Sequence, residues 1–156
     1  MKRVWAVFLT ILALDALSKW ATHTYLHPFG AAFPLFQLFG IDLSLHHVIN
    51  RGMAWGVGSH LQQLILIARI AVIAGLAIYL FFSSAAKARR YPLLLIMAGG
   101  LGNILDYFLY GHVIDMFHFT LWGYSCPIFN LADLTICLGI ALLLWKSRQR
   151  VIRAAQ

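Results

Sequence analysis

Four long apolar runs constrain the fold of this chain more than any other feature of its sequence. They cover about residues 4–25, 61–82, 92–110 and 129–145. A helix that crosses a bilayer needs about 20 predominantly apolar residues. Only 11% of the residues are charged, against about 25% in soluble domains. We therefore predict a mainly α-helical polytopic membrane protein in which residues 1–156 form a single membrane domain with four transmembrane helices.

The basic residues predict the orientation of these helices. Twelve Lys and Arg residues oppose five acidic residues. On one side of a four-span topology lie Lys2, Arg3, Lys87, Arg89, Arg90, Lys146, Arg148, Arg150 and Arg153. The opposite side carries only Arg51. Because cytoplasmic loops are rich in Lys and Arg, we expect both termini in the cytoplasm. The positive charge is thus explained by topology, and we expect no nucleic-acid partner.

The two segments on the outer side are expected to fold on the membrane surface. Residues 26–60 contain four of the seven His residues and alternate between apolar and polar positions at 41–45. This pattern favours short strands, followed by a short surface helix from about residue 53. In the second outer segment, 111–128, the stretch from His112 to Phe119 also alternates as a strand does. Within the last apolar run, Cys137 is expected to be a small buried hydrophobic residue.

Two carboxylates, Asp115 and Asp133, flank the connection between the third and fourth apolar runs. If they meet, such a pair can share one proton, so that one carboxylate activates water while the other polarises a carbonyl. A structural explanation also exists for one of them. Asn130 is a good N-cap residue, and Asp133, three residues later, favours the helix dipole. Capping does not explain Asp115, nor the other polar residues expected at the same depth.

Further polar residues interrupt the apolar runs. Asp15 and Lys19 lie four residues apart on one helical face, and Asn103 and Asp106 lie three apart. Ionisable groups within a membrane face the interior of the bundle and commonly mark functional sites. The first pair is interpreted either as an ion pair that ties helices together or as a support for a polar site near the outer surface.

Four ordered motifs resemble the lipoprotein signal peptidase (signal peptidase II) family of membrane aspartic proteases. The chain has Asp15 with Lys19 in its first run. The motifs are residues 50–55 (NRGMAW, against the family's N-x-G-A-A-F), 99–106 (GGLGNILD), 111–115 (GHVID) and 129–133 (FNLAD). The resemblance runs almost from end to end of the chain.

The resemblance implies a fold, an activity and a set of roles. The outer segments would form a small β-cradle and a short surface helix on the periplasmic side. Asp115 and Asp133 match the catalytic dyad, which cleaves before the lipidated cysteine of a diacylglyceryl-modified prolipoprotein. The remaining matches are the substrate-binding Asn50, Asn103, Asn130 and Gly52 and the supporting Asp15, Lys19 and Asp106. The family also implies a bacterial cytoplasmic (inner) membrane, contact with membrane lipid, a monomer, no metal or cofactor, and binding of the cyclic peptide inhibitor globomycin.

The chain departs from the family pattern at two places. Tyr107 follows Asp106 where the family usually has Arg, and a phenol supplies one donor where a guanidinium supplies several. We hypothesise that Arg51 or His112 compensates. Met53 and Trp55 replace the usual Ala and Phe, which predicts an altered apolar pocket.

Other functions remain open at this stage. A transport protein would use Asp15, Lys19, Asp106 and Arg69 as an ion or proton path, although the third and fourth runs are apolar towards the cytoplasm. A metal-dependent hydrolase would use the adjacent His46 and His47, but adjacent residues point in different directions. A catalytically inactive relative is a further alternative because of Tyr107.

Overall fold

The computed structural model describes residues 2–26, 32–52 and 57–154 of the chain. Within these ranges each of the four apolar runs forms a helix over most of its length, and the fourth begins at Leu131 instead of Phe129. The helices are α1 (Lys2–Tyr25), α2 (Gln62–Phe82), α3 (Arg90–Tyr110) and α4 (Leu131–Ala154), and the strands are β1 (Phe33–Leu38), β2 (Ile41–Asn50), β3 (Val113–Leu121) and β4 (Tyr124–Ser125). Two short 3-10 helices, η2 (Ser59–Leu61) and η3 (Ser84–Arg89), precede α2 and α3.

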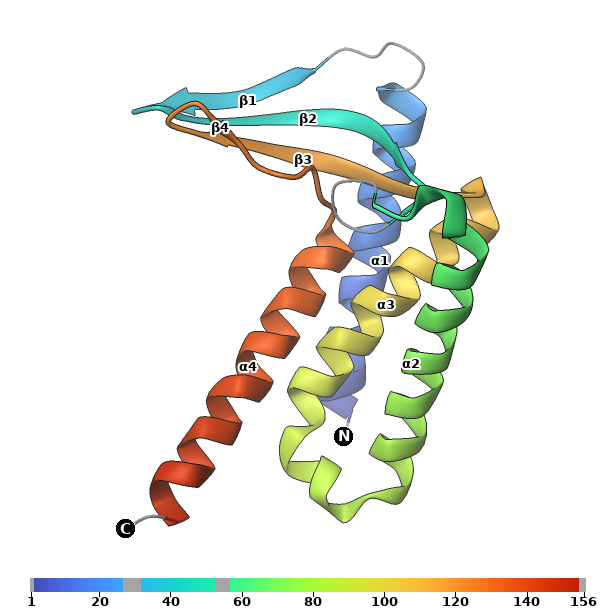
Figure 1. Ribbon diagram of the computed structural model, residues 1–156, viewed down its shortest axis with the longest axis vertical. Coiled ribbons are helices and arrows are strands. Elements are labelled where there is room, and N and C mark those ends of the chain that lie inside the picture. Colours follow the sequence, from blue (N-terminus) through green and yellow to red (C-terminus); the bar gives the residue numbers. More distant parts are fainter. Residues whose placement is uncertain (1, 27–31, 53–56, 155–156) are drawn as a thin grey trace.

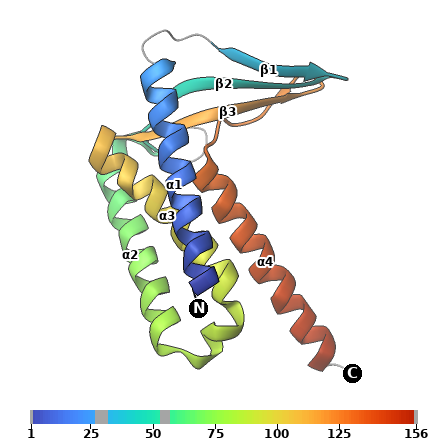
Figure 2. The same ribbon diagram turned by 180° about the vertical axis from the view of Figure 1, so that it is seen from behind.

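Helix α3 lies between the other three helices and contacts each of them (Figures 1 and 2). Its glycines make this possible. A Cβ atom added at Gly99 would collide with the carbonyl oxygen of Ala132 in α4, and one at Gly102 would collide with the Asp15 carboxylate in α1. Small residues let helices in membranes approach closely. The glycine-rich stretch therefore brings α1 and α4 against the polar face of α3.

The outward faces of the helices are apolar. In α2, Leu64, Ile67 and Val72 are each about 60% exposed in the isolated chain (60%, 62% and 59%). A soluble protein rarely exposes a continuous apolar face of this kind, whereas lipid covers it in a membrane protein. Three helical segments, Val4–Tyr25, Ser59–Phe82 and Arg90–Tyr110, are long and apolar enough to cross a membrane.

The apolar part of helix α4 has charged residues on both sides. Asp133 lies in its first turn, and Lys146 and Arg148 follow its apolar part. The basic residues that follow the fourth apolar run continue the helix to Ala154. The apolar stretch of α4 is therefore shorter than the helix that contains it.

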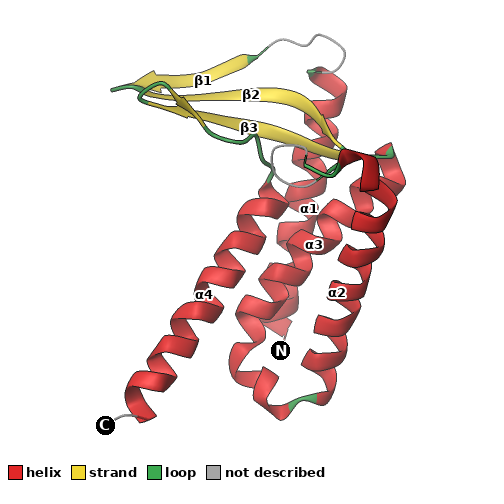
Figure 3. Ribbon diagram, in the orientation of Figure 1, coloured by secondary structure: helices red, strands yellow, loops and turns green. Residues whose placement is uncertain are grey.

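The four strands form one antiparallel sheet in the order β1-β2-β3-β4. Figure 3 shows this sheet at one end of the helical bundle, from which it projects over the side that α4 occupies. Both ends of the described chain and the connection from α2 to α3 lie at the opposite end (Figure 1). The strands predicted around residues 41–45 and 112–119 are thus confirmed, and the predicted surface helix falls largely on residues 53–56, outside the described residues.

One register shift in the sheet lies at the His pair of β2. Leu45 pairs with Phe117 and Val48 with Asp115, so β2 has one residue more than β3 between these pairs. The extra residue makes a β-bulge at His46 and His47. Beyond the bulge the strand continues to Asn50, which faces Val113. The bulge therefore sets which residues of β2 reach the end of the sheet nearest the helices.

Candidate active site

Asp115 is buried at the end of β3 that meets the helical bundle, with 2% of its surface exposed. Asn50 of β2 donates its amide N–H to Asp115 Oδ2 at 2.8 Å. Asn130 donates to the other oxygen, Oδ1, at 2.7 Å. Burial, and next the charge of Asp133, raise the pKa of Asp115 to about 6. This carboxyl can therefore exchange a proton near neutral pH.

Asp133 lies in the first turn of α4 and takes part in a reciprocal cap with Asn130. The Asp133 backbone N–H donates to Asn130 Oδ1 at 2.9 Å, and the Asn130 backbone N–H donates to Asp133 Oδ2 at 3.4 Å. The capping interpretation of these two residues is therefore correct. It does not exclude a second role, because Asn103 of α3 also donates its amide to Asp133 Oδ1 at 2.8 Å.

Pairing between the last residues before α4 and β3 brings the two carboxylates to one place. Phe129 accepts backbone bonds from Met116 and Phe117 at 3.0 and 2.8 Å, and donates to the Phe117 carbonyl at 3.1 Å. This pairing places Asn130 beside Asp115, where its amide donates both to Asp115 and, at 3.2 Å, to Asn103 Oδ1. A chain of asparagine amides thus connects Asp115 with Asp133.

Lys19 of α1 holds the buried side of this network. Its ammonium lies 2.8 Å from Asp15 Oδ2 and 2.8 Å from Asp106 Oδ2, and it donates to Asn103 Oδ1 at 3.0 Å. The two aspartates in turn hold the backbone, since Asp15 accepts from the Ala132 N–H and Asp106 from the Ile114 N–H. Both interpretations of the Asp15–Lys19 pair are therefore compatible with the structure: the ion pair ties helices together and orients Asn103.

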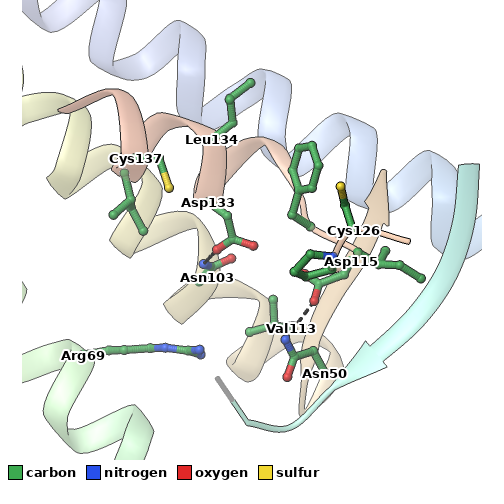
Figure 4. Close-up of a pocket in the computed structure, with 13 residues that line it drawn as sticks. Asn50, Arg69, Asn103, Val113, Asp115, Cys126, Asp133, Leu134 and Cys137 are labelled. Atoms are coloured by element: carbon green, nitrogen blue, oxygen red, sulfur yellow. Dashed lines mark hydrogen bonds between the residues drawn. The ribbon is translucent and has the colours of Figure 1, made fainter. Parts of the chain in front are cut away.

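Two adjoining cavities border Asp115, and one of them also borders Asp133. The helix-side cavity, of about 520 Å³, is shown in Figure 4. Its described lining contains the polar or charged Asn50, Arg69, Asn103, Asp115 and Asp133, the cysteines Cys126 and Cys137, and the apolar Val113, Pro127, Ile128, Phe129, Leu134 and Ile136. The expectation that Cys137 is buried is wrong: its side chain is exposed and borders this cavity, because this side of α4 is not covered by another helix.

The sheet-side cavity, of about 620 Å³, lies next to it. It includes His46, Arg51 and His118, and it shares with the helix-side cavity Asn50, Asp115, Cys126, Pro127 and Ile128. Asp115 therefore lies where the two cavities join.

The adjacent histidines of β2 point to different partners, as their spacing indicates. His46 bonds Ser44 and stacks edge-on with His118, whereas His47 bonds His23 of α1. Within the described ranges, no group of three or more His, Cys, Asp or Glu side chains is arranged to hold a metal ion. The described histidines therefore give no support to the metal-dependent hydrolase.

The remaining predicted residues are placed as follows. Gly52 donates its N–H to Asn50 Oδ1 at 2.8 Å and so fixes the Asn50 amide. Tyr107 is half-buried on α3 and lines neither cavity; nor does His112, whereas Arg51 borders the sheet-side cavity. Sequence reasoning places Arg69 only on a hypothetical ion path and misses it as a residue of the site. Its position as the one charge in the second apolar run is the sequence signal that marks it.

Known proteins resemble this chain over most of its sequence. The profile of the family described as signal peptidase (SPase) II matches residues 7–149. A lipoprotein signal peptidase of Synechocystis is 38% identical over 147 residues, which cover 92% of this chain and 86% of that protein. One from Thermodesulfovibrio yellowstonii is 34% identical over 145 residues, 93% of each chain. One from Chlamydia pneumoniae is 38% identical over 107 residues, 67% of this chain and 64% of that protein.

Solved structures resemble the chain over nearly its whole length. A bacterial membrane enzyme solved at 2.3 Å resolution superposes with a TM-score of 0.84 at 25% identity, covering 97% of this chain and 90% of the other. A second, solved at 1.9 Å, gives a TM-score of 0.78 at 26% identity, over 94% and 92% of the two chains. The chain therefore belongs to the signal peptidase II family.

Proposed function

We propose that this chain is an aspartic endopeptidase that removes the signal peptide from diacylglyceryl-modified prolipoproteins, with Asp115 and Asp133 as its catalytic dyad. Membership of the family makes it a peptidase that cleaves signal peptides from prolipoproteins. The observation that carries the assignment of residues is the network in which Asn130 and Asn103 link Asp115 to Asp133 beside one cavity.

The dyad would act as a pair that shares one proton. One carboxylate takes a proton from a water molecule, which attacks the scissile carbonyl, while the protonated partner donates to the carbonyl oxygen. Collapse of the tetrahedral intermediate breaks the C–N bond, and a carboxyl proton passes to the leaving amine. The pKa of Asp115, raised to about 6, supports this role because it lets the pair exchange protons close to neutral pH.

The surrounding asparagines would fix the geometry of the two carboxylates. Asn50 and Asn130 occupy both oxygens of Asp115, and Gly52 in turn orients Asn50. Asn103 is polarised by the Lys19 ammonium on its oxygen and donates to Asp133 from its nitrogen. Residues held in this way keep catalytic groups at their productive separation.

The two cavities suggest the path of the substrate. The helix-side cavity is bordered mainly by apolar residues of α4 and of the segment before it, and suits the apolar signal segment and the lipid chains. The sheet-side cavity, with His46, Arg51 and His118, suits the polar chain that follows the cleavage site. The scissile bond would lie where the cavities join, which is where Asp115 lies.

The membrane placement follows from the same arrangement. We propose that α4 crosses the membrane beside α3, as the fourth span of a monomeric protein in a bacterial inner membrane. The basic residues near the termini and in η3 would face the cytoplasm, and the sheet and the dyad would lie at the outer surface. The inhibitor globomycin is expected to occupy the substrate cavity.

The transport hypothesis is less favoured. A conduction path needs polar groups through the whole thickness of the membrane, but Asp15, Lys19 and Asp106 bond one another and the residues beside the sheet. Towards the other end of the bundle the described core consists of apolar residues such as Val4, Phe8 and Leu94. Family membership also favours the peptidase.

The test is cleavage of a diacylglyceryl-modified prolipoprotein by the purified protein and by Asp115→Asn and Asp133→Asn. The matched control is Asp42→Asn, which removes a carboxylate from the same sheet; Asp42 pairs with Gln37 and Thr120 and borders neither cavity. We expect cleavage by the parent and by the control, unaffected by a chelator, and loss in both dyad variants. Cleavage by either dyad variant would return that residue to a structural role.

A further inference from the structure

Arg69 is the one charged residue of α2, and its side chain reaches the helix-side cavity. It lies seven residues after the start of the helix, which is about 10 Å along the helix axis. Figure 4 shows the side chain extending from α2 towards the space bordered by Asn103 and Asn50. A charge at this depth of a membrane helix faces protein or a polar cavity and commonly has a function.

The described contacts use only one of the N–H donors of the Arg69 guanidinium. A guanidinium has five N–H donors, and Arg69 donates one hydrogen bond, to the Gly52 carbonyl at 3.1 Å, within the described ranges. The ion pairs found there all involve Lys19, so no described carboxylate neutralises Arg69. The guanidinium is therefore anchored on one side and directs further donors at the cavity.

The substrate segment that would enter this cavity offers one kind of acceptor. A signal segment has apolar side chains, and its peptide carbonyls need hydrogen-bond donors when they leave water. If the segment approaches as a helix, its last four carbonyls lack partners within the helix. Among the described lining residues of the helix-side cavity, Arg69 is the only cation.

We propose that Arg69 positions the substrate by donating hydrogen bonds to backbone carbonyl oxygens just before the scissile bond. This inference rests on the proposed function, since it assumes that the signal segment occupies the helix-side cavity. Tyr107 borders neither cavity. The guanidinium that borders the helix-side cavity is that of Arg69 in α2. The hydrogen bond to the Gly52 carbonyl orients the Arg69 guanidinium. The N–H of the same Gly52 orients Asn50.

The first measurement compares cleavage kinetics of Arg69→Gln, Arg69→Lys and the parent. Arg69→Gln removes the charged donor of the proposed hydrogen bonds to the substrate. Because hydrogen bonds to charged groups are stronger than neutral ones, we expect KM to increase roughly 10- to 100-fold. Arg69→Lys should lie between the two, because it keeps the charge but not the planar fork. The control is Ile67→Gln, which places the same amide on the exposed side of α2 that points away from Arg69 and should cleave as the parent does.

The second measurement separates contact with the substrate from an indirect effect through Gly52. In an Asp115→Asn background, which binds without cleaving, lipopeptides are compared in which one backbone amide is replaced by an ester. The ester carbonyl is a weaker acceptor, and each of the three linkages before the scissile bond is replaced in turn. We expect at least one ester to bind roughly 2- to 10-fold more weakly than the amide ligand, and Arg69→Gln to remove that difference.

Each outcome decides the proposal. If Arg69→Gln weakens all ligands by the same factor and the amide–ester ratios stay unchanged, Arg69 acts only through Gly52 and the proposal fails. If the ratio collapses at one linkage, that carbonyl is the one Arg69 contacts. The binding experiment does not need turnover, so loss of cleavage by the parent would refute the proposed function while these ratios still decide the role of Arg69.

Discussion

Replacement of Lys19 by methionine tests whether the buried ion network holds the fold together. The Lys19 side chain is fully buried (0% exposed), and its ammonium lies 2.8 Å from carboxylate oxygens of both Asp15 and Asp106. Methionine keeps an unbranched chain of similar size but removes the charge. Two buried carboxylates would then lose their common cation, and Asn103 Oδ1 would lose a donor at 3.0 Å.

The expected loss of stability is large for a single substitution. Removing one partner of a buried ion pair costs about 3–5 kcal/mol, because the remaining charge stays desolvated. The two pairs share one ammonium, so their contributions are not added. In a chain of this size, about 1 kcal/mol changes Tm by roughly 2–4 °C. We therefore expect a decrease in Tm of about 6–20 °C.

The assay is thermal denaturation of the purified protein in one detergent, followed by loss of secondary structure. Arg148→Met is the control, since it removes a cation from an exposed position of α4. Adding Asp15→Asn and Asp106→Asn to Lys19→Met should restore part of the stability, because the stranded charges are then gone. A decrease for Lys19→Met no larger than that of Arg148→Met would refute the reasoning.

Three further predictions follow from the site and the packing. Burial raises the pKa of Asp115 to about 6, so the contribution of Asp115 to stability is fully present below about pH 4 and is lost as pH rises through 6. Asp115→Asn should therefore gain more in Tm over the parent near pH 7.5 than near pH 4.5, and an equal gain at both pH values would contradict this. The same pKa predicts that the pH profile of cleavage by the parent has an apparent transition near pH 6 that belongs to the dyad, and a profile that is flat from about pH 5 to 8 would argue against it. Gly99→Ala should separate α3 from α4 and lower Tm by several degrees, whereas Gly75→Ala, where an added Cβ meets nothing within 4 Å, should be neutral or slightly stabilising; similar values for the two would show that the close approach at Gly99 is not needed.

Much of the fold follows from patterns that have a local physical cause. The helices coincide with apolar runs, since a chain in lipid must satisfy its backbone groups internally. Alternation predicts the strand containing residues 113–119, and Gly111, which adopts a positive φ of 76°, predicts the end of α3. The cap formed by Asn130 and Asp133 is predictable because it involves residues three apart. The apolar run does not predict that α4 continues through the basic residues after 145, because charge alone does not end a helix.

Local spacing and short motifs were enough to predict the class of protein, the order of its main elements and the two carboxylates proposed as the dyad. How these residues combine depends on tertiary packing. The pairing of Phe129 with β3 brings Asn130 to Asp115, and the approach of α1 to Gly102 brings Lys19 to Asn103. The same packing makes Arg69 part of the cavity wall and leaves Tyr107 outside it. These contacts join residues distant in sequence, so their geometry depends on how helices and sheet pack, which local patterns do not encode.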